Sequence, residues 1–233
     1  MASRSSSPEF SPLSIGEDLT PLPTYKAAST TSVDFANLLS PPLLLHEDLS
    51  SGCGGQLWPA GMVLTQHVLR YHRNGLEDAR ILELGAGGGL VGLGVALGCK
   101  LNHPLLLTDQ ENLLDLMHHN VKLNALGSQI HPLVLNWGEP LPKAVLEQKP
   151  DVILAADCVY FEPAFPMLLE TLEHLLALNG DATIYFCFKK RRRADMQFMK
   201  NAKKKFIVEE VEDQDRAVFS REALFLYTFK RKS

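Results

Sequence analysis

Residues 81–90 read ILELGAGGGL, an apolar segment that runs into a glycine-rich turn and then into the start of an apolar helix. Because glycines lack side chains, a ligand can lie directly on the backbone there, facing the N–H groups of the helix start. In the dinucleotide fingerprint G-x-G-x-x-G the third glycine would fall at Leu90, which disfavours a nicotinamide cofactor. A tight turn without a ligand is the alternative interpretation.

Short apolar runs alternate with longer amphipathic runs on both sides of this loop, which is typical of βαβ units and a parallel sheet. The pattern predicts strands at residues 80–84, 104–108, 130–135, 151–155 and 182–188. It predicts helices at residues 90–97, 111–124, 163–178 and 192–204, and a further helix from Pro59 onward. We therefore expect a Rossmann-like α/β fold with helices on both faces of the sheet.

The C-terminal region departs from this alternation. FIVEEVE at 206–212 and ALFLYTFK at 223–230 are separated only by a polar, turn-like segment. Two consecutive strands without a helix between them pair antiparallel or lie at an edge. We expect a seven-stranded sheet that ends in an antiparallel pair, which ordinary dinucleotide-binding folds lack.

The N-terminal 40 residues are dominated by Ser, Pro and Thr, a composition that predicts a disordered tail before a domain at 41–233. With 45% hydrophobic residues in 233, the chain can bury a full core, and its net charge of -4 gives no global attraction to nucleic acid or anionic membranes. The four cysteines form no C-x-x-C pair, so neither a zinc site nor a disulfide framework is expected. Without a secretion signal or an apolar stretch of about 18 residues, we expect a cytoplasmic protein that spans no membrane.

A second apolar segment, LLLTD, ends in Asp109, about 20 residues after the loop, where an acidic side chain can accept both hydroxyls of a ribose. Alternatively, Asp109 caps the helix that begins at Glu111. Glu83 also has two interpretations, since it could bind a cofactor or only anchor the loop by accepting backbone N–H groups.

Four segments carry a resemblance to a known family. The loop reads E-x-G-x-G-x-G, which resembles the first motif of class I methyltransferases. GQLWPAG at 55–61, LNWG at 135–138 and AADCVY at 155–160 resemble motifs of the lysine methyltransferases called methyltransferase family 16. The resemblance runs from about residue 52 to the C-terminus. It implies a seven-stranded class I methyltransferase that transfers methyl groups from S-adenosylmethionine to protein lysines.

The resemblance, together with the motif positions, assigns Asp157 and Tyr160 to catalysis and no residue to a metal. It assigns these residues to the cofactor: Trp58, Glu83, Gly85, Ala86, Gly87, Asp109, Trp137 and Ala156.

Physical reasons support these assignments separately. An indole at Trp137, beside the glycine loop, could stack on or flank adenine, and Trp58 could close the other side, although core packing is the ordinary role of a tryptophan. Asp157 could hold an incoming ammonium while Tyr160 and Phe161 wall the channel. The alternative for Asp157 is a cap on the helix near Pro163.

The stretch at 50–61 and the loop at 83–90 look most like the fungal members that methylate translation elongation factor 1-alpha. We therefore expect a monomer with that protein substrate and no membrane partner. Cys158 and Val159 stand where base-methylating enzymes carry prolines, which argues against nucleic acid. A small-molecule or nucleic-acid methyltransferase and a non-catalytic binding module remain as alternatives. The basic run at 189–193 could contact nucleic acid, dock an acidic patch of a partner, or form a solvated surface.

Overall fold

The computed structural model describes residues 28–49 and 55–232 and contains a seven-stranded sheet with strand order β5-β4-β3-β6-β7-β9-β8. The five strands predicted from the sequence form its parallel part, each within one residue of the predicted bounds. They are β3 (Ile81–Leu84), β4 (Leu105–Asp109), β5 (Ile130–Val134), β6 (Val152–Ala156) and β7 (Thr183–Lys189). The predicted fold class is confirmed.

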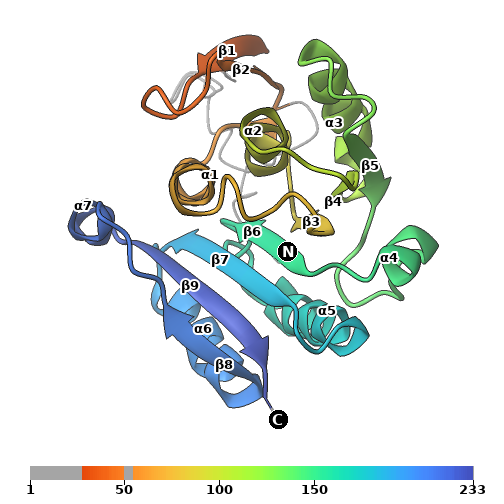
Figure 1. The fold of residues 1–233 in the computed structure, drawn as a ribbon. Helices are drawn as coiled ribbons and strands as arrows, with labels where there is room; N and C mark the ends of the chain where they lie inside the picture. Colours follow the sequence, from red (N-terminus) through yellow and green to blue (C-terminus); the bar gives the residue numbers. More distant parts are fainter. Residues whose placement is uncertain (1–27, 50–54, 233) are drawn as a thin grey trace, which may run out of the picture.

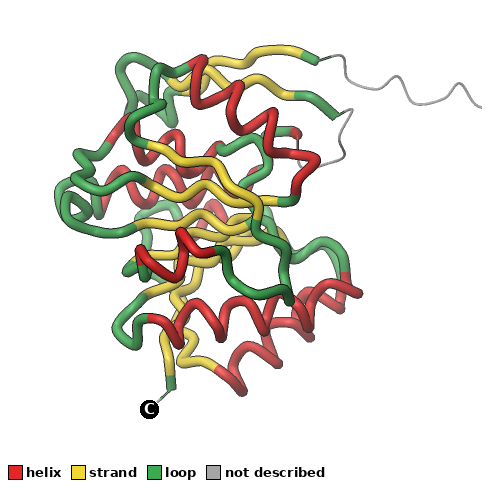
Figure 2. Tube along the Cα trace, turned by 90° about the vertical axis from the view of Figure 1, so that its right-hand side faces the viewer, coloured by secondary structure: helices red, strands yellow, loops and turns green. Residues whose placement is uncertain are grey.

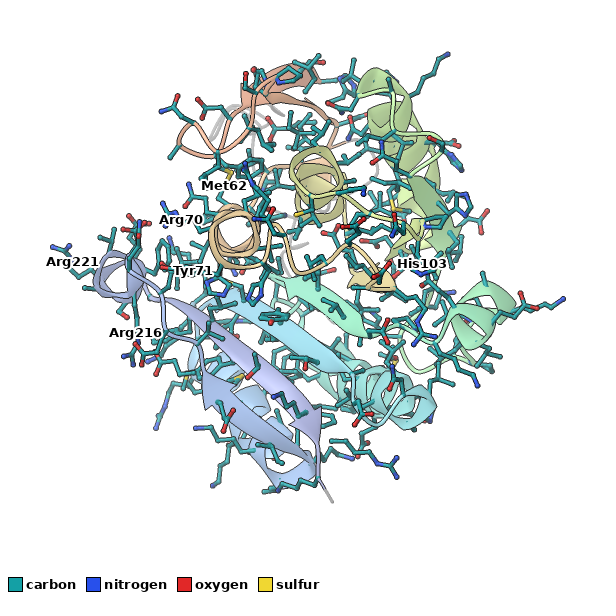
Figure 3. The ribbon with its side chains drawn as sticks, viewed as in Figure 1. Met62, Arg70, Tyr71, His103, Arg216 and Arg221 are labelled. Carbon is teal, nitrogen blue, oxygen red and sulfur yellow. The ribbon has the colours of Figure 1, made fainter. Side chains whose placement is uncertain are left out.

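The sheet ends in the expected antiparallel pair. β9 (Leu224–Arg231) lies between β7 and β8 (Phe206–Glu210) and runs antiparallel to both. The segment predicted as a turn contains a short helix, α7 (Arg216–Arg221), next to the C-terminal end of α1 (Pro59–Tyr71). Arg70 of α1 pairs with Asp215 at 2.5 Å, and the Tyr71 hydroxyl accepts the N–H of Gln214. Figure 3 labels Arg70 and Tyr71 of α1, and Arg216 and Arg221 of α7.

Helices cover both faces of the sheet, so that Figure 2 shows the strands as a layer between them. On one face lie α1, α2 (Leu90–Gly98) and α3 (Glu111–Leu123); on the other lie α4 (Lys143–Gln148), α5 (Phe165–Leu178) and α6 (Arg193–Lys205) (Figure 1). A 3-10 turn, η2 (Glu162–Ala164), precedes α5. All predicted helices are confirmed, and α4 and α7 are additional ones.

Alternating strand residues feed two separate cores. Leu105 and Leu107 of β4 point into the core under α1, α2 and α3, whereas Leu106 between them points into the core under α5 and α6. This alternation follows from the two-residue period of a strand. Both faces of the central strands are therefore apolar, as a sheet covered on both sides requires.

The domain starts earlier than the sequence predicted. Residues 28–40, assigned to a disordered tail, contain β1 (Ser29–Val33), which pairs antiparallel with β2 (Leu43–Glu47). Phe35 between them is fully buried, and a Cβ added to Gly94 of α2 would approach its ring to 3.2 Å. The predicted domain boundary at residue 40 is therefore wrong. A few apolar side chains are enough to order this segment, because Gly94 of α2 leaves room for the ring of Phe35. The rest of the expected tail, residues 1–27, lies outside the described residues.

Within the described ranges, no helix combines the length and apolar character that crossing a membrane requires. The same ranges contain no group of three or more His, Cys, Asp or Glu residues that could hold a metal ion. Cys99, Cys158 and Cys187 are buried free thiols, and Cys53 lies outside the described residues.

Candidate active site

A cavity of about 590 Å³ lies beyond the carboxyl ends of β3, β4, β5 and β6, where the strand order reverses. Open α/β sheets bind their ligands in this crevice, and the volume is in the usual range for a small-molecule site. The structure brings together every site residue predicted from the sequence. The cavity is lined by Trp58, Glu83, Gly85, Ala86, Gly87, Asp109, Trp137, Ala156, Asp157 and Tyr160.

The glycine loop forms the floor of the cavity. Gly85, Gly87 and Gly89 all have positive φ angles, of 65°, 57° and 90°, which glycine adopts without strain. A Cβ at Gly85 would also lie 3.1 Å from the Trp137 ring and 2.9 Å from the Cys158 sulfur. The absence of a side chain at Gly85 thus lets the indole of Trp137 lie directly against the loop.

Asp109 fastens this loop to the end of β4. One carboxylate oxygen accepts the N–H of Gly87 and the other accepts the N–H of Gln110, both at 2.7 Å. Burial raises the pKa of Asp109, while these two hydrogen bonds lower it. A carboxylate has about four acceptor positions, so two stay available for ribose hydroxyls. The capping interpretation is wrong, since Gln110 occupies the N-cap of α3 and no side chain caps this helix.

Glu83 lies beneath the loop and is 2% exposed. Its carboxyl oxygen accepts the N–H of Gly92 at 2.5 Å, in the first turn of α2. Burial raises the pKa of Glu83 to about 8, against the opposing effect of this hydrogen bond. The anchoring role left open by the sequence is therefore present, and Glu83 also reaches the cavity surface.

Asp157 stands at the end of β6 with a positive φ of 54°, and its side chain is only 3% exposed. Its carboxylate accepts the backbone N–H of Lys189 at 2.9 Å and two guanidinium N–H groups of Arg191, at 2.9 and 3.2 Å. The helix-cap interpretation is wrong, because η2 begins after Phe161 and has no side-chain cap.

Arg191 is a site residue that the sequence analysis did not single out. Besides pairing with Asp157, its guanidinium carbon lies 5.1 Å from the centre of the Trp58 ring, within cation–π range. The neighbouring Arg192 donates to the backbone carbonyl of Tyr160 at 2.6 Å. The available signal was the basic run at 189–193, because it follows β7 at the edge of the sheet that carries the site.

The ionisable groups of the cavity are unequal in sign. Its lining includes the carboxylates of Asp109, Glu139 and Asp157, and the only lysine or arginine among the described lining residues is Arg191, which pairs with Asp157. Glu83 also lines the cavity, but its raised pKa of about 8 keeps it mostly uncharged at neutral pH. A concave surface with an excess of one sign of charge attracts the other. The cavity therefore favours cationic ligands, such as a sulfonium or an ammonium group.

The N-terminal hairpin closes one side of the cavity through His46 of β2. The Asn120 side chain on α3 accepts the N–H of His46 at 2.8 Å and donates to the carbonyls of His46 and Gly88, at 3.0 and 2.9 Å. Asn124, one turn later, makes a similar pair of bonds to Leu44. Two asparagines four residues apart on one helix face were the sequence signal for this contact, which the analysis missed.

The sheet order, the glycine loop and the acidic end of β4 define a class I methyltransferase. Solved structures with this fold include TYW2 of P. horikoshii in complex with MeSAdo, with a TM-score of 0.54, 13% identity, and coverage of 88% of this chain and 71% of that chain. Another is the mitomycin 7-O-methyltransferase MmcR, with a TM-score of 0.53, 12% identity, and coverage of 74% and 56%. At these identities the likeness establishes the fold.

The family follows from the sequence comparisons. The family model described as lysine methyltransferase matches residues 37–205. Protein-lysine N-methyltransferase EFM6 of Saccharomyces cerevisiae is 37% identical over 204 residues, which are 78% of this chain and 83% of the relative. Protein N-lysine methyltransferase METTL21A of Danio rerio is 34% identical over 194 residues, 82% of this chain and 85% of the relative. This chain belongs to the lysine methyltransferase family, and it is an S-adenosylmethionine-dependent protein-lysine N-methyltransferase.

Proposed function

We propose that this enzyme methylates a lysine of translation elongation factor 1-alpha. The observation that carries the proposal is its similarity to EEF1A lysine methyltransferase 3 of Mus musculus, which is 33% identical over 141 residues, 60% of this chain and 57% of the relative. The resemblance of residues 50–61 and 83–90 to fungal enzymes with that substrate also supports it.

In this proposal the floor of the cavity holds the cofactor. Asp109 has two free acceptor positions for the ribose hydroxyls, and the backbone at Gly85, Ala86 and Gly87 lies open to the methionine part. Trp137 flanks the adenine, and the acidic lining suits the positive charge of the sulfonium. Trp58, Ala156 and Glu83 complete the surface. When bound, S-adenosylmethionine supplies the electrophilic methyl group.

The opposite side of the cavity receives the lysine. A lysine ammonium has an unperturbed pKa of about 10.4 and must lose its proton before its nitrogen can attack a methyl group. Asp157, buried at the end of β6, is placed to bind the ammonium and to orient the nitrogen after the proton leaves. Tyr160 and Phe161, 50% and 55% exposed, form the channel wall at its mouth.

We also propose that the folded domain begins near residue 28 and that the enzyme works as a cytoplasmic monomer on proteins and not on nucleic acid. The buried Phe35 supports the first point. The net charge of -4 and the absence of prolines at Cys158 and Val159 support a protein substrate.

Mass spectrometry of elongation factor 1-alpha, purified from cells with and without the gene, tests the substrate. We expect one lysine to lose its methyl groups in the deletion cells and to regain them when the purified enzyme and S-adenosylmethionine are added. Unchanged occupancy at every methylated lysine would refute the substrate. Labelling deletion-cell lysate with radioactive cofactor would then identify the true acceptor, and label in RNA or in small molecules would favour the alternative classes.

A further inference from the structure

The carboxylate that the proposed function assigns to the substrate is already engaged. Both oxygens of Asp157 receive hydrogen bonds from the Arg191 guanidinium, at 2.9 and 3.2 Å, and one also receives the N–H of Lys189. A lysine ammonium that approached Asp157 would meet a cation in the same place. Either the two cations exchange, or Asp157 never touches the substrate.

The mobility available to Arg191 favours exchange. Its backbone is fixed, because the N–H groups of Arg191 and Arg192 both donate to the fully buried carboxylate of Asp195, at 2.7 and 2.8 Å. Its side chain is 31% exposed, whereas that of Asp157 is 3% exposed. The guanidinium can therefore turn outward on its flexible stem while the loop stays in place, but the carboxylate cannot follow it.

The surroundings explain why Asp157 needs a cation when no substrate is bound. A nearly buried carboxylate without a partner is strongly destabilising, and a bidentate arginine pair meets this need well. The guanidinium makes two further contacts, since it lies over the Trp58 ring and donates to the backbone carbonyl of Lys189 at 3.3 Å. Small amines from solution would have to displace all three contacts of the guanidinium.

We infer that Arg191 occupies the ammonium site of the free enzyme and is exchanged for the target lysine, its guanidinium passing to a carboxylate of the substrate. The inference rests on the role that the proposed function gives to Asp157. It makes Arg191 a specificity-determining residue, because a lysine with an acidic neighbour supplies both an ammonium for Asp157 and a carboxylate for Arg191. The substrate class is therefore a protein lysine beside an aspartate or glutamate.

The first test uses NMR titration to measure how tightly n-butylammonium, a mimic of the lysine side chain, binds to the full chain saturated with S-adenosylhomocysteine. Arg191→Met keeps the aliphatic part of the side chain and removes the competing charge. The affinity of this variant for the amine should be at least about five-fold higher than that of the wild type, because occupation of the site by Arg191 reduces the apparent affinity. Lys190→Met is the matched control: it removes an equal charge from the adjacent, exposed position and should leave the affinity within about two-fold. Arg191→Lys, which can offer only one point of contact, should be intermediate and serves if the methionine variant does not fold.

The second test uses two capped dipeptides, acetyl-Lys-Glu-amide and acetyl-Lys-Gln-amide, under the same conditions. The wild-type enzyme should prefer the glutamate dipeptide, and Arg191→Met should lose that preference by binding the glutamine dipeptide more tightly. An Arg191→Met affinity for n-butylammonium that is equal to or below the wild-type value overturns the exchange and makes Arg191 a fixed partner that only positions Asp157. These binding results do not depend on elongation factor 1-alpha, so a failure of that substrate in the deletion cells is distinguishable from a failure of the exchange.

Discussion

The cavity has two walls that are built in different ways. The wall formed by the glycine loop uses backbone N–H groups, and its side chains, Glu83 and Asp109, accept hydrogen bonds from residues at most 22 positions away in the sequence. The opposite wall uses side chains that meet only after the sheet has formed, such as Asp157 and Arg191, which are 34 positions apart. The first wall depends on contacts between residues at most 22 positions apart, and the second depends on a contact between residues 34 positions apart.

Replacing Asp157 tests the second wall most severely. We expect Asp157→Ala to lower the rate of methyl transfer about a thousand-fold or more, ~4 kcal/mol of activation free energy, because the amine loses its orienting group. Cofactor affinity should stay within a few-fold, since the loop wall is untouched. Transfer assays and calorimetry on the same preparation measure both quantities. A rate near that of the wild type would mean that Asp157 has only a structural role.

A core substitution tests what supports the first wall. Phe35 is fully buried against α2, the helix that follows the glycine loop, so Phe35→Ala should lower the free energy of unfolding by about 3–5 kcal/mol. Leu44→Ala, in the same hairpin but 37% exposed, is the control and should change it by about 1 kcal/mol or less. Denaturant unfolding of both variants measures these changes in the free energy of unfolding. Equal free energies of unfolding for the two variants would support the predicted start of the domain after residue 40.

Asp109→Ala tests the first wall directly. It should weaken cofactor binding by about 1.5–3 kcal/mol, the usual loss for hydrogen bonds to a charged group. Calorimetry with S-adenosylmethionine measures the loss. Acidification should also weaken cofactor binding to the wild-type enzyme. The affinity should begin to fall at a higher pH than an aspartate with an ordinary pKa would give, because burial raises the pKa of Asp109. An unchanged dissociation constant in the variant would show that the ribose lies elsewhere.

The smallest effect is expected at Glu83. Its pKa of about 8 in the folded chain exceeds the ordinary 4.5, so the stability it contributes is complete below pH 4.5 and is lost as the pH rises through 8. Glu83→Gln cannot ionise, and its unfolding free energy should therefore vary less between pH 5 and 8 than that of the wild type. Urea unfolding across this range measures the difference. Parallel curves for the two proteins would mean that Glu83 is ionised throughout.

The features that could be predicted from the sequence are those that depend on residues close together in the chain. The five parallel strands, the loop and Asp109 were predictable because hydrophobic period and glycine spacing are local signals. β1 and β2 were both missed. The sequence of β1, STTSV, has little apolar character, and this strand is ordered by pairing with β2. The short helix α7 was missed for a similar reason, since none of its residues is buried.

The candidate site shows the same limit at the level of single side chains. All ten predicted residues line the cavity, since motifs at strand ends converge on one edge of a parallel sheet. The sequence does not specify that Asp157 pairs with Arg191, because that pairing depends on where the chain turns after β7. Nor does it specify that Asn120 connects β2 to the glycine loop, a contact that spans 74 positions along the chain.

The chain contains two tryptophans, Trp58 and Trp137, and both line the cavity. Indole fluorescence of this enzyme therefore arises entirely from its active site, without background from the rest of the fold. Trp137 lies against the glycine loop, whereas Trp58 lies beneath the Arg191 guanidinium. Replacing either one by phenylalanine would leave a single emitter, so that filling of the cofactor side and departure of the arginine could be followed as two separate optical signals in stopped-flow experiments.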